Sequence, residues 1–375
     1  MKVDFINLKK QNACLSKQLL GAVKEVIAST EFILGEQVRL FEKEFAEYCG
    51  ANYGIGVSSG TDALFLTLLS LGIGKGDEVI CPVFTYIATA LSISYTGAKP
   101  VFVDIGKQSF NIDAEQIEKK ITKKTKAIIV VHLYGQAANM APILKLAKKY
   151  KLKVIEDCAQ AHGAAWRSSN GKWQRVGAIG DAGCFSFYPT KNLGACGDAG
   201  IVLTNSNIVR KRLLVLRDQG RKGKSRNLHY IKGYNCRLDS IQAAMLRVKL
   251  KNLDKYNKLR VQKADYYSRL LKNHPGIIVP FQQDYSKDVY YNYSVLVNSR
   301  NRIKNELLKK GVHTSINFSP ALHLQRAYKE LAHKKNDFPQ AEKAAREILC
   351  LPLYPELPDA SVKYVAENLK IAARN

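Results

Sequence analysis

Short apolar runs rich in β-branched and aromatic residues recur along the first two thirds of the chain, and amphipathic stretches separate them. The apolar runs have the length and composition of buried strands, and the stretches between them have helical periodicity. The predicted strands cover residues 77–84, 98–105, 126–135, 151–159, 184–188 and 200–205. The clearest predicted helices between them cover residues 60–74, 86–97 and 140–151. This alternation is typical of an α/β protein with a mostly parallel sheet that helices cover on both faces.

The pattern changes near residue 249. Long charged helical segments cover residues 237–273, and an aromatic strand at 289–297 and a helix near 302–311 follow them. This order of helices and a strand predicts a smaller α+β domain. A chain of 375 residues also exceeds the size at which single hydrophobic cores stop growing. We therefore expect a large domain at 1–248 and a small C-terminal α+β domain at 249–375.

The formal net charge of the chain is +26. The lysines are spread along the whole sequence, and no known DNA- or RNA-binding motif accompanies them, so we expect no nucleic-acid partner. A lysine-rich proteome and a positive field that attracts small acidic ligands are the two remaining interpretations. The densest cationic cluster is the Gly-punctuated loop "GRKGKSRNLHYIKG" at 220–233.

The sequence gives no indication of a membrane protein or of a metal-binding protein. No apolar run approaches the ~18 residues that a membrane-spanning helix needs, and the N-terminal stretch has no apolar signal-peptide core. The eight cysteines form no CxxC pair and no regular spacing. We expect reduced structural thiols, no metal site, no membrane partner and a cytoplasmic location.

Two residues at predicted strand ends carry candidate chemistry. In "VIEDCAQAHGA", Asp157 ends a buried strand, where an ionised carboxylate is costly unless a cation or a protonated ring nitrogen faces it. In "CFSFYPTKNLGACGDAG", Lys191 lies in a run of small and turn-forming residues. A lysine near cationic groups in a partly desolvated pocket loses its proton more easily and can form a Schiff base.

Further candidates surround an anionic, planar ligand. In "VSSGTDALFL", Gly60 and Thr61 open a helix and can offer backbone N–H groups to an anion, although an ordinary helix cap fits equally well. Ser186 can add a hydroxyl. Tyr86 follows a strand end, where it can lie flat on a ring or belong to the core. Together with Lys191 and Asp157, these features describe a site for pyridoxal 5′-phosphate (PLP).

The order and wording of several segments resemble the sugar aminotransferases of the DegT/DnrJ/EryC1/StrS family. The segments are "ILGEQVRLFEKEFAEYCG", "SSGTDALFLTLLSLGIGKGDEVICPVFTYIATA", "VIEDCAQAHGA", "CFSFYPTKNLGACGDAG" and "GYNCRLDSIQAAMLRVKL". The resemblance implies a fold-type I, aspartate aminotransferase-like PLP enzyme, built as a homodimer. It also implies amination of the keto group of a nucleotide-linked sugar, with L-glutamate as the amino donor.

The resemblance also implies roles for individual residues. Lys191 would form the Schiff base with PLP, Asp157 would pair with the pyridinium nitrogen, and Gln160 would reach the phenolic oxygen. Tyr86 would stack on the ring. The residues implied at the phosphate are Gly60, Thr61, Ser186 and, from the partner subunit, Asn235.

The implied substrate end of the site is less defined. His323 would lie near the sugar, and His162 would lie near the cofactor or in its supporting shell. The cationic loop residues Arg221 and Lys222 would meet the nucleotide diphosphate at the pocket mouth. Phe318 stands where the family often has a tyrosine, which removes a hydroxyl from the sugar site.

Three alternative functions remain open at this level. Some relatives aminate a non-nucleotide keto-cyclitol. Others are PLP-dependent sugar dehydratases or deoxygenases that carry a histidine in place of the lysine, and Lys191 argues against that class. A non-enzymatic basic binding protein would require a lost lysine or aspartate, and both residues are present.

Overall fold

A seven-stranded sheet forms the centre of the protein, whose computed structural model describes residues 1–107, 109–221, 223 and 227–374. In sheet order the strands are β1 (Tyr53–Val57), β9 (Gly200–Thr204), β8 (Ala182–Ser186), β5 (Lys153–Asp157), β4 (Thr125–Val131), β2 (Glu78–Pro82) and β3 (Lys99–Val103). The five strands from β8 to β3 run parallel, and β9 is antiparallel to both of its neighbours. The predicted mostly parallel sheet is therefore confirmed.

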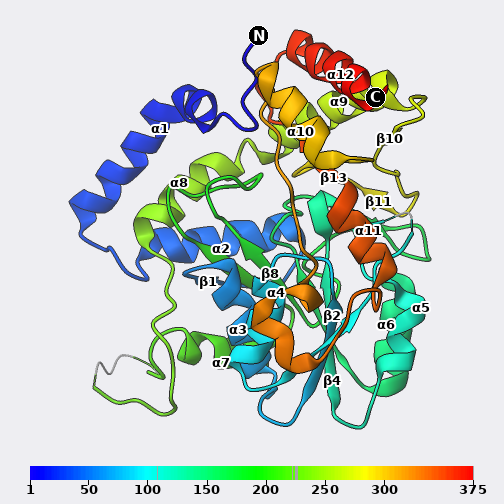
Figure 1. Ribbon diagram of the computed structural model, residues 1–375. Coiled ribbons are helices and arrows are strands. Elements are labelled where there is room, and N and C mark those ends of the chain that lie inside the picture. The colour runs from blue at the N-terminus through cyan, green and yellow to red at the C-terminus, as the bar shows by residue number, and fades with distance from the viewer. Residues whose placement is uncertain (108, 222, 224–226, 375) are drawn as a thin grey trace.

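Helices cover both faces of this sheet (Figure 1). On one face lie α3 (Gly60–Ser70), α4 (Ala88–Tyr95) and α7 (Asn207–Leu216). On the other face lie α2 (Glu36–Cys49), α5 (Ala114–Ile117), α6 (Met140–Tyr150) and α8 (Ser240–Leu250). Along β4, Ile129 packs on the face covered by α3, α4 and α7, while Ile128 and Val130 pack on the opposite face. A strand that is buried on both faces explains the continuous apolar runs in the sequence.

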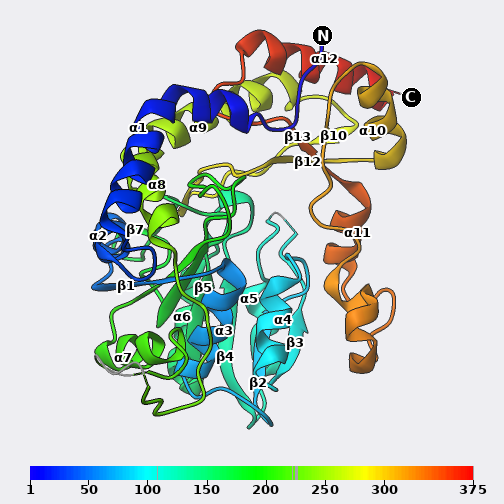
Figure 2. The ribbon, with the colours of Figure 1, turned by 90° about the vertical axis from the view of Figure 1, so that its left-hand side faces the viewer.

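A separate, smaller hydrophobic cluster lies beyond one edge of these layers, at the top of Figure 2. Its antiparallel sheet has the order β10 (Ile277–Ile278), β12 (Tyr293–Val297) and β13 (Ile348–Leu351). The helices that pack on it are α9 (Leu253–Leu271), α10 (Arg300–Lys309) and α12 (Asp359–Arg374). A third sheet, β11 (Ser286–Lys287), β6 (Ala165–Arg167) and β7 (Trp173–Arg175), links the two halves of the sequence, because β11 pairs with β6.

Segments from each end of the sequence pack against the part of the protein formed mainly by the other end. Val3 bridges to Val312 and packs in the smaller cluster, and α8 continues to Leu250. Conversely, Leu322 and Phe338 pack against the α3 face of the large sheet, next to α11 (Pro339–Glu347). Helix α1 (Leu8–Ser29) lies along α8, and both termini lie at the end of the molecule that carries α12 (Figure 2). The clusters therefore do not follow the division expected at residue 248 at every point.

Strand β1 was not predicted, because its sequence "YGIGV" contains two glycines. A Cβ atom at Gly54 would lie 2.4 Å from the carbonyl oxygen of Glu42, and one at Gly56 would lie 2.7 Å from a methyl carbon of Leu238. These contacts require glycine, although glycine is unfavourable in strands. Every helix in the described part of the chain is too short or too polar to span a lipid bilayer.

Candidate active site

A cavity of about 450 Å³ lies outside the carboxyl ends of the parallel strands. Parallel sheets bind ligands at this edge. Eight of the residues named from the sequence line this cavity: Gly60, Thr61, Tyr86, Asp157, Gln160, Ser186, Lys191 and Phe318. These residues come from the start of α3, from the ends of β5 and β8, from the segments that follow β2, β5 and β8, and, for Phe318, from the C-terminal third of the chain. The fold thus brings together residues that are up to 258 positions apart, from Gly60 to Phe318.

Lys191 is held in a tight turn. Its backbone N–H donates to the carbonyl oxygen of Tyr188 at 2.9 Å, and the N–H of Ala195 donates to Phe187 at 2.8 Å. The Nζ atom lies 4.5 Å from the centroid of the Tyr291 ring, at a distance that permits a cation–π contact. The amine is therefore placed by backbone hydrogen bonds and an aromatic ring.

Asp157 ends β5 and is buried. Its Oδ2 accepts a hydrogen bond from Thr89 Oγ1 at 2.8 Å, and its Oδ1 accepts one from the N–H of Ala159 at 3.2 Å. Burial raises the pKa of this carboxyl, while the two hydrogen bonds and the nearby charge of Lys191 oppose the rise. A cationic ligand group at this position would stabilise the ionised carboxylate further.

The first turn of α3 offers a site for an anion. Ser59 caps the helix by accepting from the N–H of Asp62, which leaves the N–H groups of Gly60 and Thr61 without intrahelical partners. A Cβ atom at Gly60 would lie 2.5 Å from Cβ of Ser186, so only glycine allows this close approach. The glycine, the free N–H groups and the neighbouring hydroxyl form a cradle with the chemistry that a phosphate group requires.

Tyr86 and Gln160 complete the lining. Tyr86 keeps 58% of its surface exposed, and its ring centroid lies 5.6 Å from that of Phe318. The Oε1 atom of Gln160 accepts from the backbone N–H of Tyr134 at 2.9 Å. Since an N–H must meet the oxygen of the amide, the nitrogen of Gln160 is the atom that remains to donate to a ligand.

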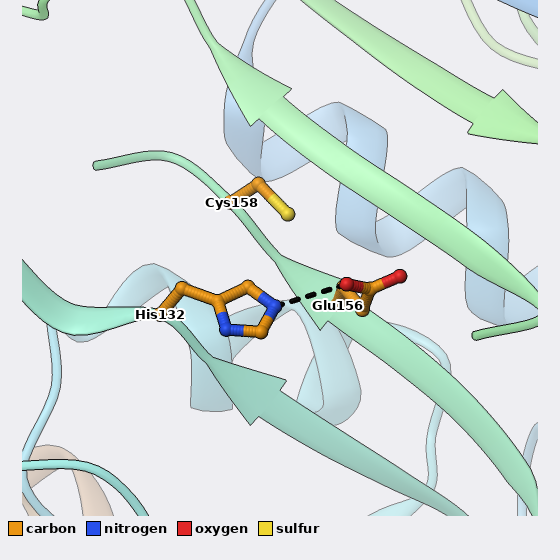
Figure 3. A group of neighbouring side chains, drawn as sticks. All are labelled: His132, Glu156 and Cys158. Carbon is orange, nitrogen blue, oxygen red and sulfur yellow. Dashed lines mark hydrogen bonds and ion pairs between the residues drawn. The ribbon is translucent and has the colours of Figure 1, made fainter. Parts of the chain in front are cut away.

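Directly behind the cavity, His132, Glu156 and Cys158 place their ligand atoms within 4.8 Å of one another (Figure 3). Ala138 donates its N–H to Nδ1 of His132, so Nε2 carries the proton and donates to Glu156 at 3.0 Å. Backbone N–H groups of the 177–180 loop fill the remaining positions of the Glu156 carboxylate. Burial also raises the pKa of the Cys158 thiol. Protein hydrogen bonds therefore already occupy the histidine and the carboxylate, and the cluster ties this loop to the sheet.

Several residues named from the sequence lie outside the cavity lining. His323 is buried and its Nε2 lies 3.1 Å from Oε1 of Glu342. His162 is packed against Phe185 and Phe187, and burial lowers its pKa to about 3. His162 is therefore a buried, packed residue that is not part of the cavity lining.

The described residues of the basic loop and of the segment after it are also absent from the lining. Arg221 pairs with Asp218, which also binds Arg237, and Lys222 falls outside the described residues. Asn235 is exposed and its backbone bridges to Asp218, while the ring of the neighbouring Tyr234 lies 4.9 Å from that of Phe65 on α3 of the same chain. No local pattern around Asn235 predicted this proximity.

Other lining residues were not named as site residues from the sequence: Thr89, Tyr188, Thr190, Asp198, Tyr291 and Asn317. Thr89 follows Tyr86 by three positions in a predicted helix, which was a local indication. Tyr291 and Asn317 come from the C-terminal third of the chain, and only the tertiary fold brings them to the cavity.

A turn-borne lysine, a buried aspartate at a strand end and a phosphate cradle share one cavity at the edge of an α/β sheet. Together with the fold, they define a PLP-dependent transferase of fold type I. The chain belongs to the DegT/DnrJ/EryC1/StrS aminotransferase family, whose model matches residues 13–370. The family is PLP-dependent, so PLP is the cofactor, and the cradle at Gly60 and the unused acceptor capacity of Asp157 fit that group.

Three similar proteins illustrate the family. The dTDP-3-amino-3,6-dideoxy-α-D-galactopyranose transaminase of Aneurinibacillus thermoaerophilus is 46% identical over 365 residues, which are 97% of this chain and 98% of the relative. The UDP-N-acetyl-3-dehydro-α-D-glucosamine 3-aminotransferase of Acidithiobacillus ferrooxidans is 40% identical over 368 residues, 98% of this chain and 97% of the relative. The crystal structure of S. venezuelae DesV with a ketimine intermediate has a TM-score of 0.96 at 38% identity. The match covers 100% of this chain and 99% of the DesV chain.

Proposed function

We propose that this aminotransferase moves an amino group from L-glutamate to a keto group at C3 of a nucleoside-diphosphate sugar. Both relatives described above carry the nitrogen at C3 in their names, and they differ in nucleotide and in sugar. Both relatives match nearly the whole chain. Because their names agree on C3 and differ in the nucleotide, they support the ring position more strongly than either nucleotide. The choice of glutamate rests on family analogy.

The observation that carries the proposal is the shared lining of one cavity by Lys191, Asp157 and the first turn of α3. In the proposed arrangement, Gly60, Thr61 and Ser186 bind the cofactor phosphate. Asp157 pairs with its ring nitrogen. When bound, the cofactor supplies an electron sink for the bond that breaks at the donor's α-carbon.

The remaining lining residues orient the ring and move protons. Tyr86 covers one face of the ring and excludes water from it, and the amide nitrogen of Gln160 donates to its phenolic oxygen. Lys191 holds the cofactor through Nζ before the donor arrives. The same Nζ then takes the proton from the donor's α-carbon and later delivers a proton to the sugar carbon that receives nitrogen.

A Lys191→Ala variant tests these assignments. Borohydride should attach PLP covalently to the wild-type protein and not to the variant. The half-reaction with glutamate, followed by the absorption of the cofactor, should slow by several orders of magnitude, because one side chain supplies both attachment and proton transfer. A half-reaction at the wild-type rate in the variant would contradict the role of Lys191.

The ring position requires a separate experiment. Keto sugars with UDP, dTDP, GDP and CDP handles, each with the keto group at C3 or C4, can be incubated with the enzyme and glutamate. Mass spectrometry and NMR of the products should show amination at C3. Amination at C4 alone would overturn this part of the proposal and leave the class of enzyme unchanged.

We further propose that the active site is shared between two subunits of a homodimer. Among the described lining residues, the charged side chains are Lys191, Asp157 and Asp198, so this lining holds one cation for a multiply anionic set of ligands. Exposed Asn235 and the basic loop that contains Arg221 and Lys222 supply polar and cationic groups if they reach the cavity of a second copy.

Subunit complementation tests the shared site. Inactive Lys191→Ala subunits are mixed with impaired Asn235→Ala subunits, and subunit exchange is confirmed by differently tagged chains. If Asn235 acts across the interface, the heterodimer contains one site with both wild-type residues, and activity returns. Exchange without any return of activity refutes the shared site.

The proposed location is the cytoplasm. All eight cysteines are free, and six of them are buried. Free thiols of this number are usual in a reducing compartment.

A further inference from the structure

Two buried threonines form a directed hydrogen-bond chain that ends on Asp157. Thr89 Oγ1 lies 2.8 Å from Asp157 Oδ2, and Thr85 Oγ1 lies 3.0 Å from Thr89 Oγ1. A carboxylate only accepts, so the single hydroxyl proton of Thr89 points to Asp157. The proton between the two threonines must therefore come from Thr85.

Both threonines border the cavity but are almost inaccessible to solvent. Thr89 is 1% exposed and Thr85 is 3% exposed. Hydrogen bonds to a charged acceptor are among the stronger ones in proteins, and low local polarity strengthens them. Thr89 is the side-chain donor that opposes the effect of burial on Asp157, and the N–H of Ala159 is the backbone donor.

The same turn presents the aromatic platform. The backbone N–H of Thr89 donates to the carbonyl oxygen of Tyr86 at 3.1 Å, and Tyr86 lies between the two threonines in the sequence. Residues 85–89 thus connect the side chain that covers the cavity with the carboxylate at its floor. A displacement of this turn would move both groups.

Other groups also face Asp157 from the elements packed against it. Lys191 follows β8, and its positive charge favours the ionised carboxylate, whereas His132 follows β4 and donates from Nε2 to Glu156. The buried thiols of Cys158 and Cys184 are also neighbours, and burial keeps both protonated by raising their pKa. Thr89 is the side-chain hydrogen-bond donor to Asp157, and its hydroxyl can be removed with all of these groups left in place.

We propose that Thr89, oriented by Thr85, is a positioning residue that keeps Asp157 ionised and aims its carboxylate at the cofactor's ring nitrogen. The proposal rests on the proposed role of Asp157 and is independent of which sugar is the substrate. Thr85 acts on Asp157 only through Thr89, so its contribution is smaller.

The test compares Thr89→Val, which keeps the shape and loses the hydroxyl, with Thr89→Ser, which keeps the hydroxyl. Ser92→Ala is the matched control, because Ser92 is a buried hydroxyl on α4 that donates to the Thr89 carbonyl oxygen and not to Asp157. The readouts are PLP affinity by equilibrium dialysis, the pH profile of the glutamate half-reaction and thermal stability.

We expect Thr89→Val to bind PLP about tenfold more weakly, because one charge-assisted hydrogen bond is lost. Loss of the donor raises the pKa of Asp157, so the acid limb of the half-reaction should move to higher pH. Thr89→Ser should restore affinity and the acid limb, and Thr85→Val should weaken PLP binding by about threefold. Ser92→Ala should leave both properties at their wild-type values.

Two outcomes overturn the proposal. In the first, Thr89→Val binds PLP with wild-type affinity and has an unshifted acid limb. In the second, Ser92→Ala reproduces the changes of Thr89→Val, which would assign them to the packing of α4. None of these measurements uses a nucleotide sugar, so they remain decisive even if the proposed sugar substrate is wrong.

Discussion

Two acidic residues stand side by side at the end of β5, and the sheet separates their surroundings. Glu156 points to the α2 and α6 face, where it accepts hydrogen bonds from three backbone N–H groups and from His132. Asp157 points to the opposite face and into the cavity, where one hydroxyl and one backbone N–H approach it. Burial is similar for both, but the number of donors is not.

This difference separates a structural carboxylate from a functional one. The acceptor positions of Glu156 are used within the fold, so its charge holds the 177–180 loop against the sheet. Asp157 keeps unused acceptor capacity toward the cavity, and burial raises its pKa. A cationic group of a ligand can therefore pair with the acceptor positions of Asp157 that no protein donor occupies.

The largest effect is expected from Asp157→Asn. The change keeps the shape and removes the charge that faces the ring nitrogen, so the glutamate half-reaction should slow by about 10²–10³-fold. Rapid-mixing spectroscopy of the PLP-loaded protein measures this rate, and dialysis checks that cofactor remains bound. A wild-type rate would show that Asp157 is structural, as Glu156 is.

The same variant sharpens the comparison through its stability. The folded-state pKa of Asp157 is raised above the ordinary 3.8, so the folded state binds the proton more tightly than the unfolded state. Ionised Asp157 therefore lowers stability as pH rises through the window from 3.8 to the raised pKa. At pH 7 the Asp157→Asn apoprotein should be at least as stable as wild type in urea titrations, and this advantage should vanish below pH 3.8.

Glu156→Gln should have the opposite signature. One carboxylate oxygen becomes an NH₂ group that faces N–H donors, and the free energy of unfolding should fall by about 3 kcal/mol. Glu47→Gln is the control, because Glu47 is exposed and forms only a surface pair with Lys43, so about 0.5 kcal/mol or less is expected. Equal stability losses in the two variants would contradict the structural role of Glu156.

Three glycines give the next contrast. A Cβ at Gly180 would lie 2.6 Å from the carbonyl oxygen of Val154, so Gly180→Ala should cost about 2 kcal/mol of stability without weakening PLP binding. Gly60→Ala should weaken PLP binding as well, because the contact at 2.5 Å is with Ser186 in the cavity lining. A Cβ at Gly21 would meet no atom within 4 Å, so Gly21→Ala in α1 should be neutral or stabilising. Urea titrations and equilibrium dialysis with PLP measure the two properties for all three variants.

The central sheet was predictable because its strands are buried on both faces. The predicted strand at 126–135 contains the apolar run at 127–131, and the predicted strand at 151–159 contains a shorter one at 154–155; the observed strands are Thr125–Val131 and Lys153–Asp157. Strand β13 was not predicted, since Ile348–Leu351 directly follows α11 without a turn residue. The expected boundary at 248 also could not anticipate that Val3 packs with the C-terminal cluster, because that contact joins residues far apart in the sequence.

The site was predictable where function depends on residues next to strand ends. Asp157 and Lys191 stand in local patterns that ordinary strands and turns do not require. Thr89 and Tyr291 were not named, because their roles depend on distances of 2.8 Å to Asp157 Oδ2 and 4.5 Å to Lys191 Nζ. Contacts of this kind arise only once the layers are packed.

The smallest effect is expected at His323, whose carboxylate partner resembles Glu156 rather than Asp157. Its Nε2 donates to Glu342, which also accepts the backbone N–H of Asn336 at 2.6 Å, and burial lowers the pKa of the histidine. His323→Gln should lower the free energy of unfolding by about 1 kcal/mol, because one buried hydrogen bond is weakened. The KM for the keto sugar should change less than threefold, since His323 is not part of the cavity lining. A tenfold rise in this KM at unchanged stability would restore the sugar-binding role implied by the sequence and would place His323 with the functional residues.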